Sequence, residues 1–444
     1  MSDYLKEHSK TIRYLVKNAE KGVLEAQFQL YEYYDLGKYV DKDEKLADRY
    51  FAMYVNSLSS KKIHLESLKM WMFRRFHSID ISFDEKMTVI IGDNGAGKTS
   101  FADAIAKTFS WFNNNIEKDD VNGRLLIEDD VNSASTDFSE VISFFSLGKK
   151  NRFEAALARP VIGYTGSKSN DVSIIKRFGR MYRKAACDKR IIIPLLAFYS
   201  VDRSNISLKK PSLEKAFDDK ERNRFYALKD ALDGSGKLDN FSELYIELVN
   251  LASGKDTKEI RDLREQISLL ERSIYGVYEN KTPPDNDPFI AKLNDKKEEL
   301  SIFLKSLSLT KYQKHLNFVN KAIESLVPSV KNLRVDRSLG RPRIIVDNFG
   351  VSVNITQLSQ GQKVLVALTG DLARRLVILN PEVDNPLEAH GIVVIDEVEL
   401  HLHPRWQQDI LIGLQKTFPH LQFIVTTHSP QVLSTVDKKL GRRN

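Results

Sequence analysis

The sequence predicts an α/β fold that is organised around one glycine-rich loop and interrupted by a helical hairpin. Three observations support this prediction. Short β-branched runs alternate with helical stretches, one of these runs leads into Gly-x-x-x-x-Gly-Lys-Thr, and a heptad pattern fills the middle of the chain. We expect four parts, over residues 1–60, 61–205, 206–330 and 331–444.

The first part, residues 1–60, has a helical pattern with small residues where two helices would meet. Gly22, Ala26, Gly37 and Ala47 are among the residues that resemble one tetratricopeptide-like helical repeat. A single repeat cannot bury its own apolar face, so we expect it to pack against a neighbour, a partner or another copy of the chain. An ordinary helical hairpin and a binding module fit this pattern equally well.

The second part begins with alternating apolar residues from Ile63 to Phe83, which predict an antiparallel strand pair. The acidic, Asn/Ser-rich stretch from Ile116 to Asp137 predicts an exposed loop, and the apolar run from Ile191 to Tyr199 predicts a buried strand. Seven cations lie from Lys176 to Arg190, with two aromatic residues among them. This basic run is either a solvated face or a contact for nucleic-acid phosphates.

A buried strand over Val89–Ile91 runs directly into the glycine-rich loop Gly92–Thr99, and a helical pattern follows. The glycines allow backbone N–H groups to surround phosphate oxygens, and the N-terminus of the following helix favours negative charge. We expect Lys98 to reach the β- and γ-phosphates of a nucleotide and the Thr99 hydroxyl to ligate Mg²⁺. The predicted nucleotide-binding residues here are Asn94, Gly95, Gly97, Lys98, Thr99 and Ser100.

The third part, residues 206–330, has apolar residues spaced alternately by three and four positions from Ile260 to Val277, which is a heptad seam. Prolines in the segment Lys281–Pro288 interrupt this pattern, and helical spacing returns from Leu293 to Leu307. We therefore expect an antiparallel coiled-coil hairpin, whose first helix, residues 258–280, would be about 35 Å long.

The fourth part, residues 331–444, begins with two β runs on either side of Asp347–Gly350, which predict a hairpin. The segment Leu358–Gln362 then opens a helix. The candidate catalytic residues come later, at the ends of two buried strands.

The first of these strands, Gly391–Ile395, is followed by Asp396 and Glu397, which is the Walker B arrangement. We expect Asp396 to hold Mg²⁺ through water and Glu397 to polarise the attacking water. The second strand, Phe423–Thr427, is followed by His428. A histidine at a strand end is either structural or, in this context, beside the γ-phosphate, and we favour the second role.

The composition limits the setting of the protein. Its 67 Lys+Arg and 60 Asp+Glu residues give a net charge of +7, a small excess that suits a polyanionic partner. Cys187 is the one cysteine, which excludes an intrachain disulfide and a cysteine cluster for zinc. No apolar run is long enough to cross a bilayer and the N-terminus is polar, so we expect a cytoplasmic protein without a membrane partner.

The order of these motifs resembles that of the ABC-type ATPases, and within them the branch with the SMC and DNA-repair ATPases, over about residues 63–430. The resemblance implies an ABC-type P-loop ATPase head with a short antiparallel coiled-coil insertion, with ATP and Mg²⁺ as ligands. It also implies that two copies sandwich two ATP molecules. The signature residues Ser359, Gly361 and Gln362 would then contact the nucleotide that the opposite copy holds.

This sequence departs from the family pattern in two places. Gln360 stands where transporters commonly have glycine. The usual Q-loop glutamine has no clear match, and Tyr199 and Arg203 lie near the expected position of that loop. The residue with that role therefore stays open.

A closer resemblance is to the ATPases of bacterial anti-phage systems, the overcoming-lysogenization-defect-like and Septu (PtuA) group. It rests on the stretch Asp396–Pro404 (DEVELHLHP) and on Thr427–Pro430. The sequence ends at Asn444, where the first type continues into a TOPRIM nuclease domain. Two interpretations of this end stay open: the chain is truncated, or it is of the PtuA kind, an ATPase served by a separate HNH nuclease (PtuB-like), which we favour. The tetratricopeptide-like N-terminus looks like the variant found with retrons, in which a reverse transcriptase and its RNA–DNA product (msDNA) complete the system.

Three classes of function follow from this pattern. The favoured class is a defence ATPase that forms homodimers or higher oligomers, regulates a nuclease partner, associates with nucleic acid and hydrolyses ATP slowly or for regulation. The second is an SMC-like DNA-repair or recombination ATPase acting on DNA ends, whose arm should be longer and end in a dimerising tip. The third is a transporter ATPase, which the coiled-coil insertion disfavours.

Overall fold

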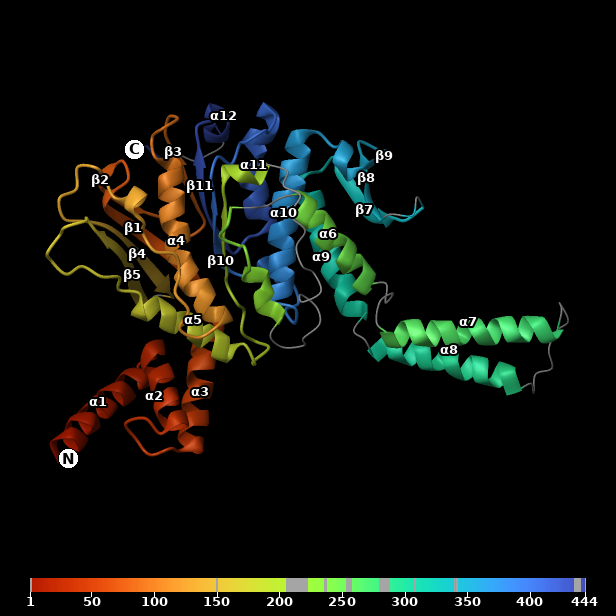
Figure 1. Cartoon of the computed structure of the whole chain (residues 1–444), viewed down its shortest axis with the longest axis horizontal. Helices are drawn as coiled ribbons and strands as arrows, with labels where there is room; N and C mark the ends of the chain where they lie inside the picture. Colours follow the sequence, from red (N-terminus) through yellow and green to blue (C-terminus); the bar gives the residue numbers. More distant parts are fainter. Residues whose placement is uncertain are drawn as a thin grey trace. The chain divides into compact units, whose positions relative to one another are not determined.

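The structure is a computed structural model that describes residues 2–148, 151–204, 223–234, 238–252, 258–278, 288–306, 309–338, 340, 342–434 and 441–443. Contacts divide the chain into two compact units. The first unit contains Met1–Ile206, Glu214–Lys237 and Arg375–Asn444, and the second contains Ser207–Leu213 and Leu238–Arg374. Figure 1 labels helices and strands of both units.

The core of the first unit is a parallel sheet with the strand order β12-β3-β11-β10-β6. Its strands are β3 (Met87–Ile91), β6 (Leu195–Tyr199), β10 (Gly391–Ile395), β11 (Leu421–Thr427) and β12 (Gly441–Arg443). Strands β6, β10 and β11 are buried along their whole length, as expected for parallel strands whose two faces are covered. Because these strands all run in one direction, their carboxyl ends meet at one edge, where parallel α/β sheets bind ligands.

Helix α4 (Lys98–Glu117) follows β3 after the glycine-rich loop and lies alongside the sheet (Figure 1). Phe101, Ile105 and Phe109 of this helix are buried, which confirms the helical pattern predicted after the glycine-rich loop. Two further helices, α11 (Pro404–Thr417) and α12 (Pro430–Leu433), follow β10 and β11.

Strand β6 is shorter than the predicted strand over Ile191–Tyr199. It begins at Leu195, and residues 191–194 have no regular structure. Pro194 precedes the strand, and a proline has no N–H to donate to a β ladder. Only the second half of the apolar run, from Leu195 onward, therefore forms a strand.

A second sheet of the first unit is antiparallel, with the order β2-β1-β4-β5. Its strands are β1 (Ile63–Phe73), β2 (Phe76–Ser82), β4 (Phe138–Leu147) and β5 (Arg152–Pro160). The pairing of β1 with β2 confirms the predicted strand pair. Burial alternates residue by residue along β4, as expected for a strand with one face toward the core.

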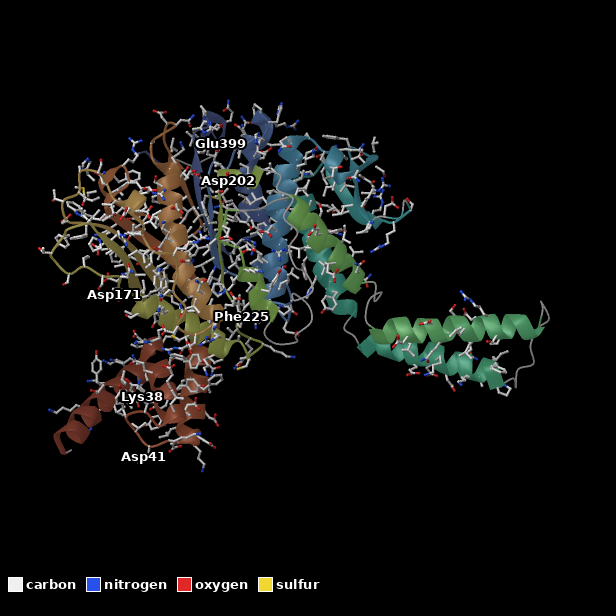
Figure 2. The ribbon with its side chains drawn as sticks, in the orientation of Figure 1. Lys38, Asp41, Asp171, Asp202, Phe225 and Glu399 are labelled. Atoms are coloured by element: carbon white, nitrogen blue, oxygen red, sulfur yellow. The ribbon has the colours of Figure 1, made fainter. Side chains whose placement is uncertain are left out.

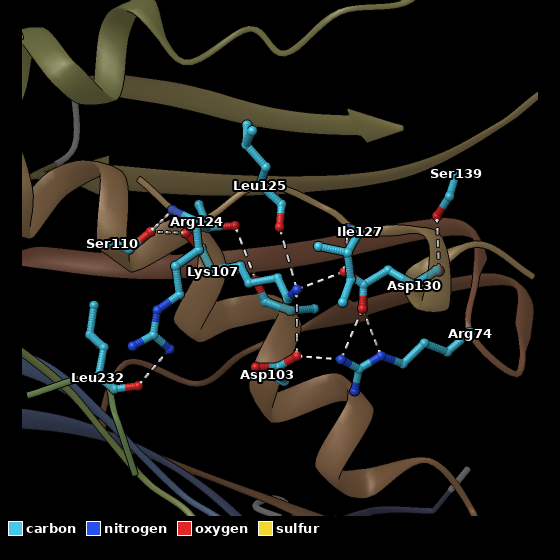
Figure 3. A network of polar contacts seen from close by, with 12 residues as sticks. Arg74, Asp103, Lys107, Ser110, Arg124, Leu125, Ile127, Asp130, Ser139 and Leu232 are labelled. Atoms are coloured by element: carbon cyan, nitrogen blue, oxygen red, sulfur yellow. Dashed lines mark hydrogen bonds and ion pairs between the residues drawn. The ribbon is translucent and has the colours of Figure 1, made fainter. Parts of the chain in front are cut away.

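The prediction of an exposed loop over Ile116–Asp137 is wrong in part, because Asp130 within it is fully buried. The Asp130 carboxylate accepts hydrogen bonds from Lys107 Nζ at 2.6 Å and from Arg74 Nε at 2.9 Å (Figure 3). Arg74 also pairs with Asp103 of α4. The acidic composition of this stretch favoured an exposed loop. The sequence alone does not show that the cations which compensate Asp130 lie on α4 and in the β1–β2 turn.

The N-terminal helices are α1 (Ser2–Glu20), α2 (Leu24–Leu36) and α3 (Glu44–Ser59). Aromatic rings pack α2 against α3, with Phe28 edge-on to Tyr54 at 5.2 Å between ring centroids. Whether these helices form a tetratricopeptide-like repeat stays a prediction. They belong to the first unit, together with α5 (Ser173–Ala185).

The basic run on α5 has a role that neither sequence interpretation anticipated. Four of its seven cations pair with carboxylates of α2 and of the segment after α4, whereas Lys184 and Lys189 are exposed. The ion pairs are Arg177 with Glu25, Arg180 with Glu32 at 3.3 Å, Arg183 with Asp119 at 2.7 Å and Lys176 with Asp120 at 2.9 Å.

The second unit is mainly helical. Its helices are α6 (Leu238–Ala252), α7 (Lys258–Tyr278), α8 (Pro288–Ser306), α9 (Leu309–Leu326) and α10 (Gln360–Leu379), the last five residues of α10 belonging to the first unit. Its antiparallel sheet has β7 (Val330–Asp336), β8 (Arg343–Asn348) and β9 (Val351–Asn354), and β8 with β9 forms the predicted hairpin. The unit thus extends to Arg374, beyond the predicted insertion boundary at residue 330.

Helices α7 and α8 lie side by side, as the heptad seam predicts (Figure 1). Leu263 and Ile267 of the seam are buried, and an ion pair of 2.9 Å joins Glu271 of α7 to Lys297 of α8. The predicted tip, residues 281–287, lies outside the described residues. Among the helices that the structure describes, none has the length and apolar character that a membrane span requires.

Candidate functional site

The glycine-rich loop joins β3 to α4 with the geometry of a phosphate-binding loop. Gly95 and Gly97 have φ angles of 81° and 93°, in the left-handed region that favours glycine. The Lys98 ammonium lies within the loop, where it donates to the carbonyl oxygens of Gly92 at 2.8 Å and Asp93 at 3.0 Å. The predicted Asn94 is exposed and Ser100 is half-buried, in the first turn of α4.

The turn between β1 and β2 packs directly on this loop. A Cβ atom placed on Gly97 would lie 2.5 Å from Cζ of Phe76 and 2.8 Å from Cδ of Arg75. Only glycine therefore fits at this position without displacing the side chains of Phe76 and Arg75. The Arg74–Asp130–Lys107 network anchors the same turn to α4, so the buried ion pairs position the loop from outside.

The Walker A and Walker B segments meet at the carboxyl edge of the parallel sheet. The Thr99 hydroxyl donates a hydrogen bond of 2.6 Å to Oδ2 of Asp396, although the two residues are 297 positions apart. The other oxygen, Oδ1 of Asp396, accepts a hydrogen bond from the Thr426 hydroxyl at the end of β11. A hydroxyl and a carboxylate in this position are the ligands that Mg²⁺ takes in P-loop enzymes, so the residues present fit the metal.

The backbone of Glu397 is fixed from both sides. Its N–H donates to Thr426 Oγ1 at 2.9 Å, and its carbonyl oxygen accepts from Nη2 of Arg203 at 2.6 Å. Glu397 has a φ of 46°, an uncommon conformation for a residue other than glycine, which these two contacts hold in place. The side chain is half-buried and is thereby presented at the sheet edge.

Arg203 is a buried cation that binds main-chain oxygens. Nη1 donates to the carbonyl oxygens of Asp396 at 2.6 Å and Ser200 at 2.9 Å. Burial lowers the pKa of Arg203 to about 10, against the opposing effect of Asp396, Glu399 and Glu397. The guanidinium therefore stays charged at neutral pH.

His428 follows β11, as predicted, and its partner is Glu399. Oε1 of Glu399 accepts a hydrogen bond of 2.7 Å from the backbone N–H of His428 and lies 3.0 Å from Nδ1 of its ring. The Glu399 side chain is 5% exposed, whereas that of His428 is 46% exposed. Figure 2 labels Glu399 at the end of the central strands.

The predicted signature residues lie at the N-terminus of α10, in the second unit. Ser359 and Gln362 form a reciprocal cap: Oγ of Ser359 accepts from the Gln362 N–H at 3.3 Å, and Oε1 of Gln362 accepts from the Ser359 N–H at 3.0 Å. The Gln362 amide also donates to Ser329 at 3.0 Å and Asn348 at 2.7 Å. Gly361 is buried and Ser359 is exposed.

The structure thus brings together one group of predicted residues and assigns another to the second unit. Lys98, Thr99, Asp396, Glu397 and His428 follow strands of a single sheet. Sequence reasoning placed Arg203 near the expected Q-loop but missed its contacts, and it missed the roles of Thr426 and Glu399, which hold the catalytic candidates in place. Glu399 stands inside the motif DEVELHLHP, and its spacing of two residues from Glu397 was the only signal of its role.

Comparison with known proteins agrees with this geometry. The sequence matches the AAA ATPase domain family (AAA_15) over residues 64–433. The chain belongs to this family. It is 31% identical over 440 residues to the Retron Ec83 probable ATPase of Escherichia coli, covering 96% of this chain and 80% of that protein. It is 29% identical over 435 residues to the Retron Vc95 probable ATPase of Vibrio cholerae serotype O1 biovar El Tor, covering 96% and 82%.

Two further comparisons cover less or are more distant. The Septu protein PtuA of Bacillus mycoides (strain KBAB4) is 33% identical over 144 residues, which is 32% of this chain and 18% of that protein. A more distant match is the solved structure of the Smc head domain with an extended coiled coil from Pyrococcus furiosus, bound to the C-terminal domain of ScpA. The match covers 84% of this chain and 92% of the Smc chain, with a TM-score of 0.43 and 15% identity.

These findings confirm three predictions made from the sequence. The fold is an α/β P-loop ATPase fold, the chain is an ATPase, and its relatives are the PtuA-like, retron-associated ATPases. The roles of the individual site residues stay predictions, as do the dimer and the partners.

Proposed function

We propose that the protein binds and hydrolyses ATP as the nucleotide-driven subunit of an anti-phage defence system of the retron or Septu type. The observation that carries the proposal is the hydrogen bond of 2.6 Å between Thr99 and Asp396, which joins Walker A to Walker B. Glu397 and His428 follow strands that end at the same edge. The similarity to retron and Septu ATPases supports the defence setting.

Binding of ATP uses the glycine-rich loop and the start of α4. The backbone N–H groups of Gly95, Gly97 and Lys98 surround the phosphates, and the Lys98 ammonium exchanges its loop carbonyl partners for β- and γ-phosphate oxygens. Thr99 and Asp396 would hold Mg²⁺, which neutralises the charge of the phosphates when it is bound.

Hydrolysis depends on the two strand-end residues. The Glu397 carboxylate accepts a proton from the water that attacks the γ-phosphate, and the fixed backbone of Glu397 keeps the carboxylate in reach of that water. His428 lies beside the γ-phosphate. The products are ADP and phosphate.

The signature residues act on a second copy of the chain. Ser359 and the first N–H groups of α10 form a helix N-terminus suited to an anion, and they would contact the γ-phosphate bound to the opposite copy. Gln362 contributes mainly by holding the cap, because both N–H groups of its amide already donate to Ser329 and Asn348. ATP thereby closes a homodimer or a higher oligomer.

The ATP-driven closure regulates partners in the cytoplasm. We assign an HNH nuclease of the PtuB kind as the effector, with a reverse transcriptase and its RNA–DNA product as further components. The coiled-coil hairpin and helices α1–α3 offer the docking surfaces. Nucleic acid would have to be bound by residues other than Arg177, Arg180 and Arg183, which are paired with carboxylates.

The proposal is tested with Glu397→Gln, which keeps nucleotide and metal ligands but removes the base. We expect hydrolysis to fall by about 10²–10⁴-fold and the ATP-bound dimer to accumulate in sedimentation experiments. Lys98→Ala is the matched control and should neither bind ATP nor dimerise. Normal turnover in Glu397→Gln would refute the site, and equal sedimentation with and without ATP would refute the dimer.

A further inference from the structure

Glu399 is a buried carboxylate with an unusual set of contacts. Its Oε1 atom serves both the backbone N–H and the ring Nδ1 of His428, at 2.7 and 3.0 Å. Its Oε2 atom is buried and has no hydrogen-bond partner among the described residues. A buried charged oxygen without a partner destabilises the fold, so its presence requires an explanation.

Fold stability does not require a negative charge at this position. A glutamine would offer the same acceptor to the His428 N–H and would place a neutral group in the buried site at lower cost. Besides the contact with His428, Arg203 interacts with this charge through space, and its own hydrogen bonds go to main-chain oxygens. What the charge does serve is the imidazole, since a carboxylate that faces Nδ1 holds a proton on that nitrogen and fixes the ring plane.

We propose that Glu399 is a positioning residue for ATP hydrolysis, which orients His428 with Nδ1 protonated and leaves Nε2 for the γ-phosphate. The geometry supports this division, because the carboxylate is buried while the histidine side chain is half exposed at the sheet edge. The inference rests on the proposed role of His428 and goes beyond it. It gives the second glutamate of DEVELHLHP a defined task, separate from the base Glu397.

The first test is Glu399→Gln in the full chain. We expect kcat for ATP hydrolysis to fall by about 10–100-fold while KM for ATP is unchanged, because the nucleotide ligands are untouched. Glu140→Gln is the matched control. Glu140 is another largely buried glutamate, on β4, and it forms an ion pair with Lys168 at 2.7 Å. Its change should leave kcat unaltered. A wild-type kcat in Glu399→Gln would overturn the inference.

The second test separates orientation of the ring from support of the backbone. In a double-mutant cycle with His428→Ala, Glu399→Gln should cause no additional loss of kcat if Glu399 acts through the imidazole. If the two losses multiply fully, Glu399 supports only the backbone and the inference is overturned. Dependence on Lys98 and Glu397 would persist in that case, so the proposed function would stand.

A spectroscopic measurement reads the ring directly. In protein labelled with ¹⁵N-histidine, the signals that disappear in His428→Ala belong to His428. We expect a protonated Nδ1 in the wild type and in Glu140→Gln, and a shifted tautomer signature in Glu399→Gln. Identical His428 signals in the wild type and Glu399→Gln would overturn the inference, whatever the effect on turnover.

Discussion

Replacing Asp130 with asparagine should strongly destabilise the first unit. The carboxylate is fully buried and accepts hydrogen bonds from Lys107, Arg74 and the backbone N–H of Ile127, at 2.6, 2.9 and 2.9 Å. Asp130→Asn removes the carboxylate charge closest to the Lys107 ammonium, whose side chain is 9% exposed, and leaves Asp103 at 4.0 Å as the next carboxylate in contact. Removing one member of such a buried pair costs about 3–5 kcal/mol, which lowers Tm by roughly 6–20 °C at 2–4 °C per kcal/mol.

The pH dependence of the same variant gives a sign that can be checked. Burial alone would raise the pKa of Asp130, but hydrogen bonds from Lys107, Ile127 and Arg74 lower it overall. A lowered folded-state pKa stabilises the protein above the unfolded value of about 3.9, and this contribution is lost as the pH falls through the folded-state pKa. The wild type and Asp130→Asn should therefore differ in Tm at pH 7, and the difference should shrink only as the pH falls through the lowered pKa of Asp130.

The assay is thermal unfolding followed by circular dichroism, with Asp120→Asn as the control. Asp120 also forms an ion pair with a lysine, but it is exposed, so its change should leave Tm unaltered. The KM for ATP should rise in Asp130→Asn, because Arg74 anchors the turn that packs on Gly97. A shift in Tm at pH 7 no larger than that of the control would refute the reasoning.

Two further predictions follow from the packing of the first unit. Gly97→Ala should abolish detectable ATP binding, since it combines a backbone strain of about 1–3 kcal/mol in the left-handed region with a collision against the Phe76 side chain. The control Gly22→Ala has a similar φ of 83° but no neighbouring atoms within reach of the new Cβ, so it should bind ATP normally. Equal ATP affinity in both variants would contradict the assignment of the loop. Arg177→Glu should weaken the packing of α2 against α5 by about 1 kcal/mol, and adding Glu25→Arg should restore it. Hydrogen exchange of the amides in α1–α3 measures both effects. No recovery in the double variant would mean that this ion pair does not hold these helices in place.

The parallel strands and the residues that follow them could be predicted from the sequence. Three of the five strands, β3, β10 and β11, contain short runs of β-branched residues, and each is followed by a motif residue, Gly92, Asp396 or His428. Strand β6 lacks such a motif, and β12 (Gly441–Arg443) was not predicted. A parallel sheet then brings these residues to one edge without further information. This is why the catalytic candidates could be placed together before any coordinates were known.

The partners of charged side chains could not be predicted in the same way. Glu25 lies 152 positions before Arg177, and nothing in a local pattern indicates that they meet. A run of cations is usually solvated, so composition favoured exposure for α5 just as it did for the loop that contains Asp130. A local sequence pattern predicts that a charged residue is exposed, because most charged residues are. Whether an opposite charge lies close enough to allow burial depends on the tertiary fold.

Arg203, whose contacts the sequence did not reveal, explains how a carboxylate-rich edge is kept both folded and reactive. Three acidic residues, Asp396, Glu397 and Glu399, lie within four positions, and the guanidinium remains charged because its pKa is about 10. Its hydrogen bonds go to the carbonyl oxygens of Asp396 and Glu397 and to none of the three carboxylates. The cation thus offsets their repulsion through space while their oxygens stay available, for Thr99 at Asp396, for water at Glu397 and for the histidine at Glu399. A lysine could not reproduce this, because one ammonium lacks the planar fork that reaches two consecutive carbonyl oxygens at 2.6 Å.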